Sequence, residues 1–142
     1  MNLFEMVLAL MAVVFFTSVA ANYNRKILDQ NDYLINATQY VQATQLCHTV
    51  LDEVDAKLFA KMIAFFSVKT TYANVNRTID LAFPGDVYQL NIQTVDCDSL
   101  GIPLVTPVTK NIWVRVTVTA RTAGLKVPVS LQRVYTKTHL NL

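Results

Sequence analysis

Few residues of this 142-residue chain have the types and spacing that enzymatic or metal chemistry requires. His48 and His139 have no ligand partners at metal-binding spacing, and on a helix His48 points about 100° away from the neighbouring Cys47. Asp96 and Asp98 are a thin basis for a calcium site. With only three glycines, the chain has no phosphate-binding loop, and it lacks a nucleophile elbow and a Cys-x-x-Cys pair. The sequence therefore predicts no enzyme and no cofactor or metal site.

One carboxylate, Glu5, has an unusual environment. It is the only charged residue in 1–24, a predominantly apolar stretch without Gly or Pro. At about 1.5 Å per residue, residues 1–21 form a helix of roughly 30 Å, the thickness of a bilayer's hydrocarbon core. A carboxylate in such a span is costly and indicates a function with a partner. No Lys or Arg precedes Arg25, so the nearest cation is an N-terminal amine. The alternative is a first-turn acid that favours the helix dipole and reaches the membrane interface.

The same stretch is a poor secretory signal, because it lacks a basic n-region and its apolar run is too long. The positive-inside rule, applied to Arg25 and Lys26, places the following domain in the cytoplasm. That domain nevertheless has the features of an exported one. The two observations agree if a short basic leader once preceded Met1 and has been removed.

These residues resemble the amino terminus of the type IV pilin family, which includes the pseudopilins of secretion systems. The similarity rests on Met1, on Leu3 and Phe4, on Glu5 at the fifth position, and on the apolar run to Ala21. The resemblance implies that a prepilin peptidase exposes Met1, which is then N-methylated, and that Glu5 pairs with the amine of a neighbouring subunit. It also implies a helical homopolymer as the partner, pilus assembly machinery, and storage in the inner membrane before assembly.

The remainder of the chain predicts an α+β domain built on the continuation of this helix. Residues 25–66 contain no Gly or Pro, and their apolar residues recur with helical spacing. We expect one helix into the early sixties, with its apolar end at 60–66 under the sheet. The expected domains are thus 1–24 as anchor, 25–66 as amphipathic helix, and 67–142, which forms a head with 43–66. The expected buried stripe is Ala43, Cys47, Val50, Leu51, Val54, Leu58 and Met62.

Residues 67–142 predict three or four antiparallel strands in a meander, which pack on one helix. The clearest is 112–121, in which alternate residues from Ile112 to Ala120 face inward, while Trp113 and Arg115 face outward. The strands are expected near 72–81 and over 87–95, 112–121 and 127–137, with turns at 84–86 and 122–124.

The two cysteines, Cys47 on the helix and Cys97 at the sheet, are expected to form a disulfide if the domain is exported. Closing a loop of about 50 residues stabilises a fold by roughly 4 kcal/mol in the chain-entropy model. In a cytosolic domain the same residues would remain reduced and buried.

Charge is unevenly distributed, although the formal net charge is only +2. Residues 29–55 carry acids without bases, and residues 99–142 carry bases without acids. This favours a solvated sheet face or complementary surfaces between stacked subunits over a nucleic-acid site. Trp113, Arg115 and Arg121 form a candidate contact patch; the alternative is a subunit-packing surface or a loop that covers Trp113.

These observations lead us to expect a structural subunit of an extracellular type IV pilus-like filament, assembled through a bundle of N-terminal helices at the cell surface. Two alternatives remain open. One is a pseudopilin, which has the same anchor and fold. The other is a signal-anchored extracytoplasmic binding module in which Glu5 is incidental.

Overall fold

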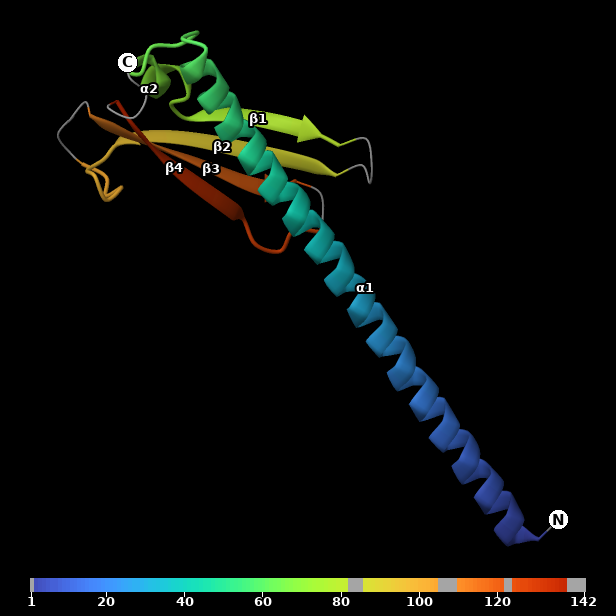
Figure 1. The fold of residues 1–142 in the computed structure, drawn as a ribbon. Coiled ribbons are helices and arrows are strands. Elements are labelled where there is room, and N and C mark those ends of the chain that lie inside the picture. Colours follow the sequence, from blue (N-terminus) through green and yellow to red (C-terminus); the bar gives the residue numbers. More distant parts are fainter. Residues whose placement is uncertain (1, 82–85, 105–109, 122–123, 138–142) are drawn as a thin grey trace. The chain divides into compact units, whose positions relative to one another are not determined.

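The computed structural model describes residues 2–81, 86–104, 110–121 and 124–137. The chain is α+β and divides into two compact units, the N-terminal unit (Met1–Ala37) and the head (Thr38–Leu142). A single long helix belongs to both. The elements are α1 (Leu3–Phe59), α2 (Ser67–Thr71), β1 (Val75–Asp80), β2 (Val87–Asp96), β3 (Asn111–Ala120) and β4 (Val129–Thr136) (Figure 1).

The four strands form one antiparallel sheet in the order β1-β2-β3-β4, which confirms the expected meander. Leu90 of β2 lies between Arg77 of β1 and Val118 of β3 in the register. The alternation predicted for the third strand is confirmed, because Ile112, Val114, Val116 and Val118 are buried. Such β-branched residues pack well on a pleated, half-buried surface. The expected turns at 84–86 and 122–124 lie largely outside the described residues.

Within the head, the C-terminal part of α1 crosses one face of this sheet (Figure 1). Its buried residues are Gln39, Ala43, Cys47, Val50, Leu51, Val54 and Leu58, at the helical spacing that the sequence predicted. They pack with Tyr88, Leu90 and Ile92 of β2 and with the inward residues of β3. Tyr135 of β4 adds a hydrogen bond, since its hydroxyl donates to the Leu51 carbonyl at 3.2 Å.

The helix ends at Phe59, earlier than expected, in a turn that the sequence does not signal. Lys61 has a φ of 54°, its N–H donates to the Leu58 carbonyl at 3.0 Å, and the Met62 N–H donates to the Lys57 carbonyl at 2.9 Å. This pair of bonds is the Schellman motif, which normally has glycine at the left-handed position. Because a lysine occupies that position, no glycine marks the end of the helix.

The expectation that 60–66 lies under the sheet is wrong for most of the segment. Phe65 is buried, as are Val68 and Tyr72 beyond it. Met62, which we placed in the buried stripe, is 74% exposed, and Phe66 is 50% exposed. The early helix end turns the chain away after Phe59, so the helical spacing no longer determines which side chains face the sheet.

Candidate assembly site on the N-terminal helix

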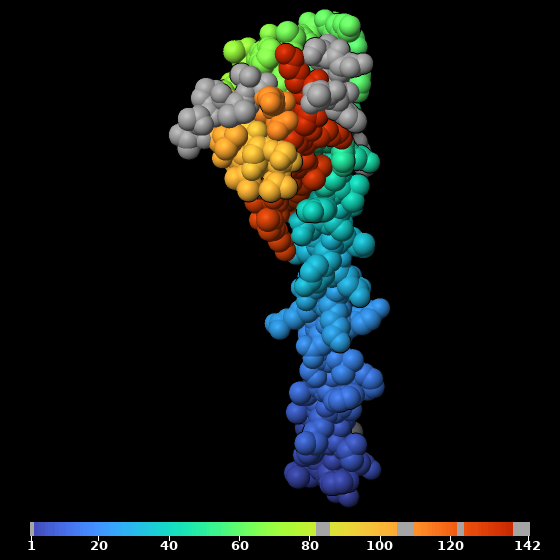
Figure 2. Space-filling view, turned by 60° about the vertical axis from the view of Figure 1, so that its left-hand side comes forward, coloured from blue at the N-terminus to red at the C-terminus, as the bar shows by residue number. Residues whose placement is uncertain are grey.

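The apolar stretch at the start of α1 is long enough and apolar enough to cross a membrane. Its most apolar 18-residue window has a mean hydropathy of 2.3, and none of that window is buried. The stretch lies within α1, and in Figure 2 the side chains of the blue residues project on every side visible in that view. A helix that is apolar all round must be covered by lipid or by protein. Among the described residues, nothing covers it.

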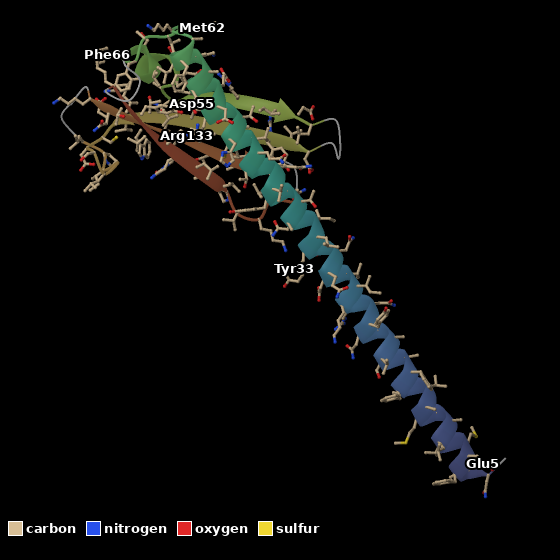
Figure 3. All side chains as sticks on the ribbon, viewed as in Figure 1. Glu5, Tyr33, Asp55, Met62, Phe66 and Arg133 are labelled. Carbon is tan, nitrogen blue, oxygen red and sulfur yellow. The ribbon has the colours of Figure 1, made fainter. Side chains whose placement is uncertain are left out.

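Glu5 lies in the first turn of this helix and bonds to its own chain (Figure 3). The Asn2 backbone N–H donates to Glu5 Oε2 at 3.1 Å, and the Asn2 carbonyl accepts from the N–H groups of Glu5 and Met6. The carboxylate thus satisfies one of the N–H groups that a helix N-terminus leaves unpaired. In a single copy Glu5 has the geometry of a first-turn acid. Met1, the other residue predicted for assembly, lies outside the described residues.

The hydroxyl groups inside the stretch are bonded to the helix backbone. Thr17 Oγ1 donates to the carbonyls of Val13 and Val14 at 2.8 and 3.0 Å. Ser18 Oγ donates to the Phe15 carbonyl at 2.8 Å. Hydroxyls bonded in this way need no partner from outside the helix. Both residues can therefore face lipid tails or another apolar helix at little cost.

Exposed apolar side chains continue past residue 24, the expected end of the apolar helix. Ile27, Leu28, Tyr33, Leu34 and Ile35 are all exposed. Tyr33 projects from the middle of α1 in Figure 3. Leu28 and Ile35, seven residues apart, lie on one helical face. This spacing was readable from the sequence, which predicted an amphipathic helix over 25–66 but did not single out these residues.

The disulfide expected between Cys47 and Cys97 is contradicted by the structure, in which both cysteines are free and buried. The Cys47 thiol lies against the Val116 carbonyl at 3.6 Å, whereas the Cys97 N–H donates to the Asn111 carbonyl. Val116 and Asn111 are five residues apart on β3, or about 17 Å. Bridged cysteines need Cα atoms within about 7 Å. Cys47 on α1 therefore lies against the middle of β3, whereas Cys97 follows β2 beside the first residue of β3.

Acidic residues of α1 form ion pairs with basic residues of the sheet inside the head. Arg133 of β4 contacts Asp52 of α1 at 3.2 Å and also contacts Asp55, and Figure 3 shows Arg133 beside the helix. Arg77 of β1 contacts Glu53 at 2.7 Å. Arg133, from the basic C-terminal segment, thus joins the acidic part of α1 to β4, and Arg77 joins it to β1. The uneven charge noted in the sequence is therefore not wholly available for contacts between subunits.

Arg77 stabilises the charged form of Glu53. Its hydrogen bonds, with a smaller contribution from Lys57 and against the opposing effect of burial, lower the pKa of the Glu53 carboxyl from 4.5 to about 2. Tyr72, which is buried, also donates to Glu53 Oε1, at 3.2 Å. Glu53 is therefore a structural carboxylate that accepts from three side chains.

The contact patch predicted at Trp113 is not an exposed surface. Trp113 is only 4% exposed, and the Arg115 guanidinium lies 4.4 Å from the ring centroid and donates to Gln132 Oε1. Trp113 and Arg121 are eight residues apart along β3 and its end, or about 27 Å. The three residues do not form one patch. Alternation predicted the face on which Trp113 lies, and the structure supports the alternative in which Trp113 on that face is covered.

The residues with the strongest claim to metal binding are engaged elsewhere. Asp96 is buried and contacts Lys69 at 2.5 Å, and Asp98 Oδ1 accepts from the N–H groups of Leu100 and Ile102 at 2.9 and 2.8 Å. Within the described ranges no group of three or more His, Cys, Asp or Glu is placed to hold a metal ion. His48 is exposed, and His139 lies outside those ranges.

No family model, curated protein or solved structure matches this chain.

Proposed function

We propose that this protein is the structural subunit of a type IV pilus-like filament, held in a membrane before assembly. The observation that carries the proposal is the apolar stretch at the start of α1. It is an apolar helix with its hydroxyls bonded internally and with one carboxylate in its first turn. The same helix continues into the core of the head, so it links the head mechanically to whatever covers the apolar half.

In this mechanism the helix exchanges lipid for the apolar helices of other copies. Lipid tails and apolar side chains are similar solvents, so the gain in free energy comes from close packing and from polar contacts rather than from the hydrophobic effect. Glu5 supplies such a contact, with a cation of the neighbouring copy. In the family that the sequence resembles, this cation is the N-terminal amine. A carboxylate without a partner in a dry bundle would be strongly unfavourable.

The test is to replace Glu5 in the full chain by Ala and, separately, by Gln, which keeps the acceptor for the Asn2 N–H but removes the charge. Both variants should enter the membrane fraction normally and give few filaments in the fraction sheared from cells. Asp80→Asn, which neutralises an exposed carboxylate of the head, is the control and should leave filaments at the normal level. Abundant filaments from the Glu5 variants would refute the role of Glu5.

The same experiment separates the filament from a membrane-anchored binding module. A filament subunit is recovered in the sheared fraction as a polymer, whereas an anchored module stays in the membrane fraction as single chains. Wild-type protein found only in the membrane fraction would overturn the proposed function.

A further inference from the structure

The head has an exposed apolar surface at the end of α1 that the proposed function does not use. It consists of Phe59, Met62 and Phe66, here named the tip patch, which are 68%, 74% and 50% exposed. In Figure 3 Met62 and Phe66 lie at the end of the head where α1 stops. The Schellman turn at Lys61 fixes the backbone between Phe59 and Met62, so these two side chains are presented by an ordered segment.

The surroundings of the tip patch are basic. Lys61 and Lys137 are exposed, and the Lys137 ammonium lies 5.0 Å from the Phe66 ring centroid. Lys57 and Lys69, by contrast, are paired with Glu53 and Asp96. The sequence has no acid between residues 56 and 79. A partner for this surface should therefore be apolar and acidic.

The N-terminal unit has a surface of that chemistry. Leu28, Asp32 and Ile35 follow one another at i, i+4 and i+7, so they line one helical face, here named the acidic stripe. Leu28 and Ile35 are 65% and 46% exposed. Asp29 is close by. Arg25, three residues before Leu28, bounds the acidic stripe on its N-terminal side, and there is no Lys or Arg from residue 27 to residue 56.

We propose that the tip patch of one copy docks on the acidic stripe of a second copy. Lys61 and Lys137 would then face Asp29 and Asp32, while Met62 and Phe66 cover Leu28 and Ile35. Two different surfaces of the same chain meet in this contact, which makes it heterologous, and a heterologous contact that does not close into a ring generates an open helical polymer. The inference rests on the proposed function and adds a contact made by the head to the bundle of N-terminal helices.

Cysteine cross-linking of the full-length protein in cells tests the contact directly. Ile35→Cys and Met62→Cys are combined in one chain, and sheared filaments are treated with a short bifunctional thiol reagent. Cys47 and Cys97 are buried, so they should not react in the folded head. A ladder of covalent multimers is expected, because each copy contributes both surfaces. Co-expression of the two single variants should give dimers only. Gln45→Cys with Met62→Cys is the matched control and should give no ladder.

A charge exchange provides a second readout if the cysteine variants assemble poorly. Asp29→Lys combined with Asp32→Lys should reduce the yield of filaments about tenfold, as expected for a loss of roughly 1.4 kcal/mol per contact. Lys61→Asp combined with Lys137→Glu in the same chain should restore it. Asp suits position 61 because Asp and Asn tolerate positive φ better than most residues.

The outcomes distinguish the docking contact between copies from the proposed filament function and from contact with a membrane. Normal wild-type filaments without a specific ladder and without rescue by charge exchange would overturn the docking contact and leave the proposed function standing. Failure of the wild type to form filaments would overturn the proposed function. If Lys61→Asp leaves filaments unchanged but weakens binding of the full chain to vesicles containing anionic lipid, the tip patch faces a membrane surface and the contact between copies is refuted.

Discussion

At the scale of single residues, the head is held together by carboxylates of α1 that accept from both edges of the sheet. Glu53 illustrates this, because Arg77 and Lys57 donate to it at 2.7 and 2.6 Å and the buried Tyr72 donates as well. Lys57 and Arg77 also lie 5.5 and 5.9 Å from the Tyr72 ring centroid. Removal of the charge at Glu53 would weaken several contacts at once.

We predict that Glu53 makes the head acid-sensitive. Its pKa in the folded state, about 2, lies below the ordinary value of 4.5. Its contribution to the free energy of unfolding is therefore complete above about pH 4.5 and is lost as the pH falls towards 2. Because the Glu53–Arg77 pair is partly exposed to water, we expect Glu53 to contribute about 1–2 kcal/mol to the free energy of unfolding at neutral pH.

Chemical unfolding of detergent-solubilised protein from pH 7 to pH 2 measures this effect. The wild type should be more stable than Glu53→Gln at pH 7, and the difference should disappear near pH 2. Asp80→Asn serves as the control. A difference between wild type and Glu53→Gln that stays constant over this pH range would contradict the assignment.

The two thiols lead to a second prediction at this scale. Burial raises the pKa of Cys47 to about 11 and also raises the pKa of Cys97, so little reactive thiolate is present at neutral pH. Neither thiol should react with an aromatic disulfide reagent in the native protein, and both should react after unfolding without a reductant. Recovery of no thiols after unfolding would show that the disulfide forms after all.

At the scale of elements, one buried side-chain amide, that of Gln39, connects the first residues of α1 in the head to the loops of the sheet. Gln39 is 4% exposed, and its Nε2 donates to Asp86 Oδ2 at 3.0 Å. Gly124, in the connection between β3 and β4, lies against the same side chain. A Cβ at position 124 would be 1.9–2.2 Å from the Gln39 amide atoms. The glycine leaves room for the side chain of Gln39.

Gly124→Ala should therefore destabilise the head by about 1–3 kcal/mol, because Gln39 must leave its place and lose its bond to Asp86. Gln39→Ala removes the clash, so the double variant should lose less stability than the sum of the losses in the two single variants. Thermal unfolding of the four proteins of this cycle measures the coupling. Purely additive losses would show that the two residues do not compete for the same space.

At the scale of the whole molecule, the two units have different requirements. The head buries its own core, whereas the apolar part of the N-terminal unit depends on a surrounding that one chain does not supply. We predict that Ala12→Arg, near the middle of the apolar stretch, lowers the fraction of protein in alkali-washed membranes, since a central arginine costs about 2.5–3.5 kcal/mol on insertion. Asn31→Arg, beyond the stretch, is the control. Unchanged membrane recovery of Ala12→Arg would count against a membrane span.

Much of the fold was predictable because it depends on local periodicity. Alternation at period two located β2 and β3 and the inward faces of both, and helical spacing identified Ala43 to Leu58 as the buried stripe of α1. The apolar stretch and Glu5 within it could also be identified from the sequence, since length and composition suffice to recognise a helix that can span a bilayer. For these features a residue's neighbours in sequence determine its environment.

The remaining features depend on residues far apart in sequence, and only the tertiary structure decided them. It showed that Cys47 and Cys97 are free and contact different parts of β3, that Trp113 is covered, and that Arg133 pairs with the acids of α1. It also ended α1 at a lysine in a left-handed conformation, which exposed Met62. Local patterns assign a side chain to a face, but the contacts on that face depend on how the elements pack together.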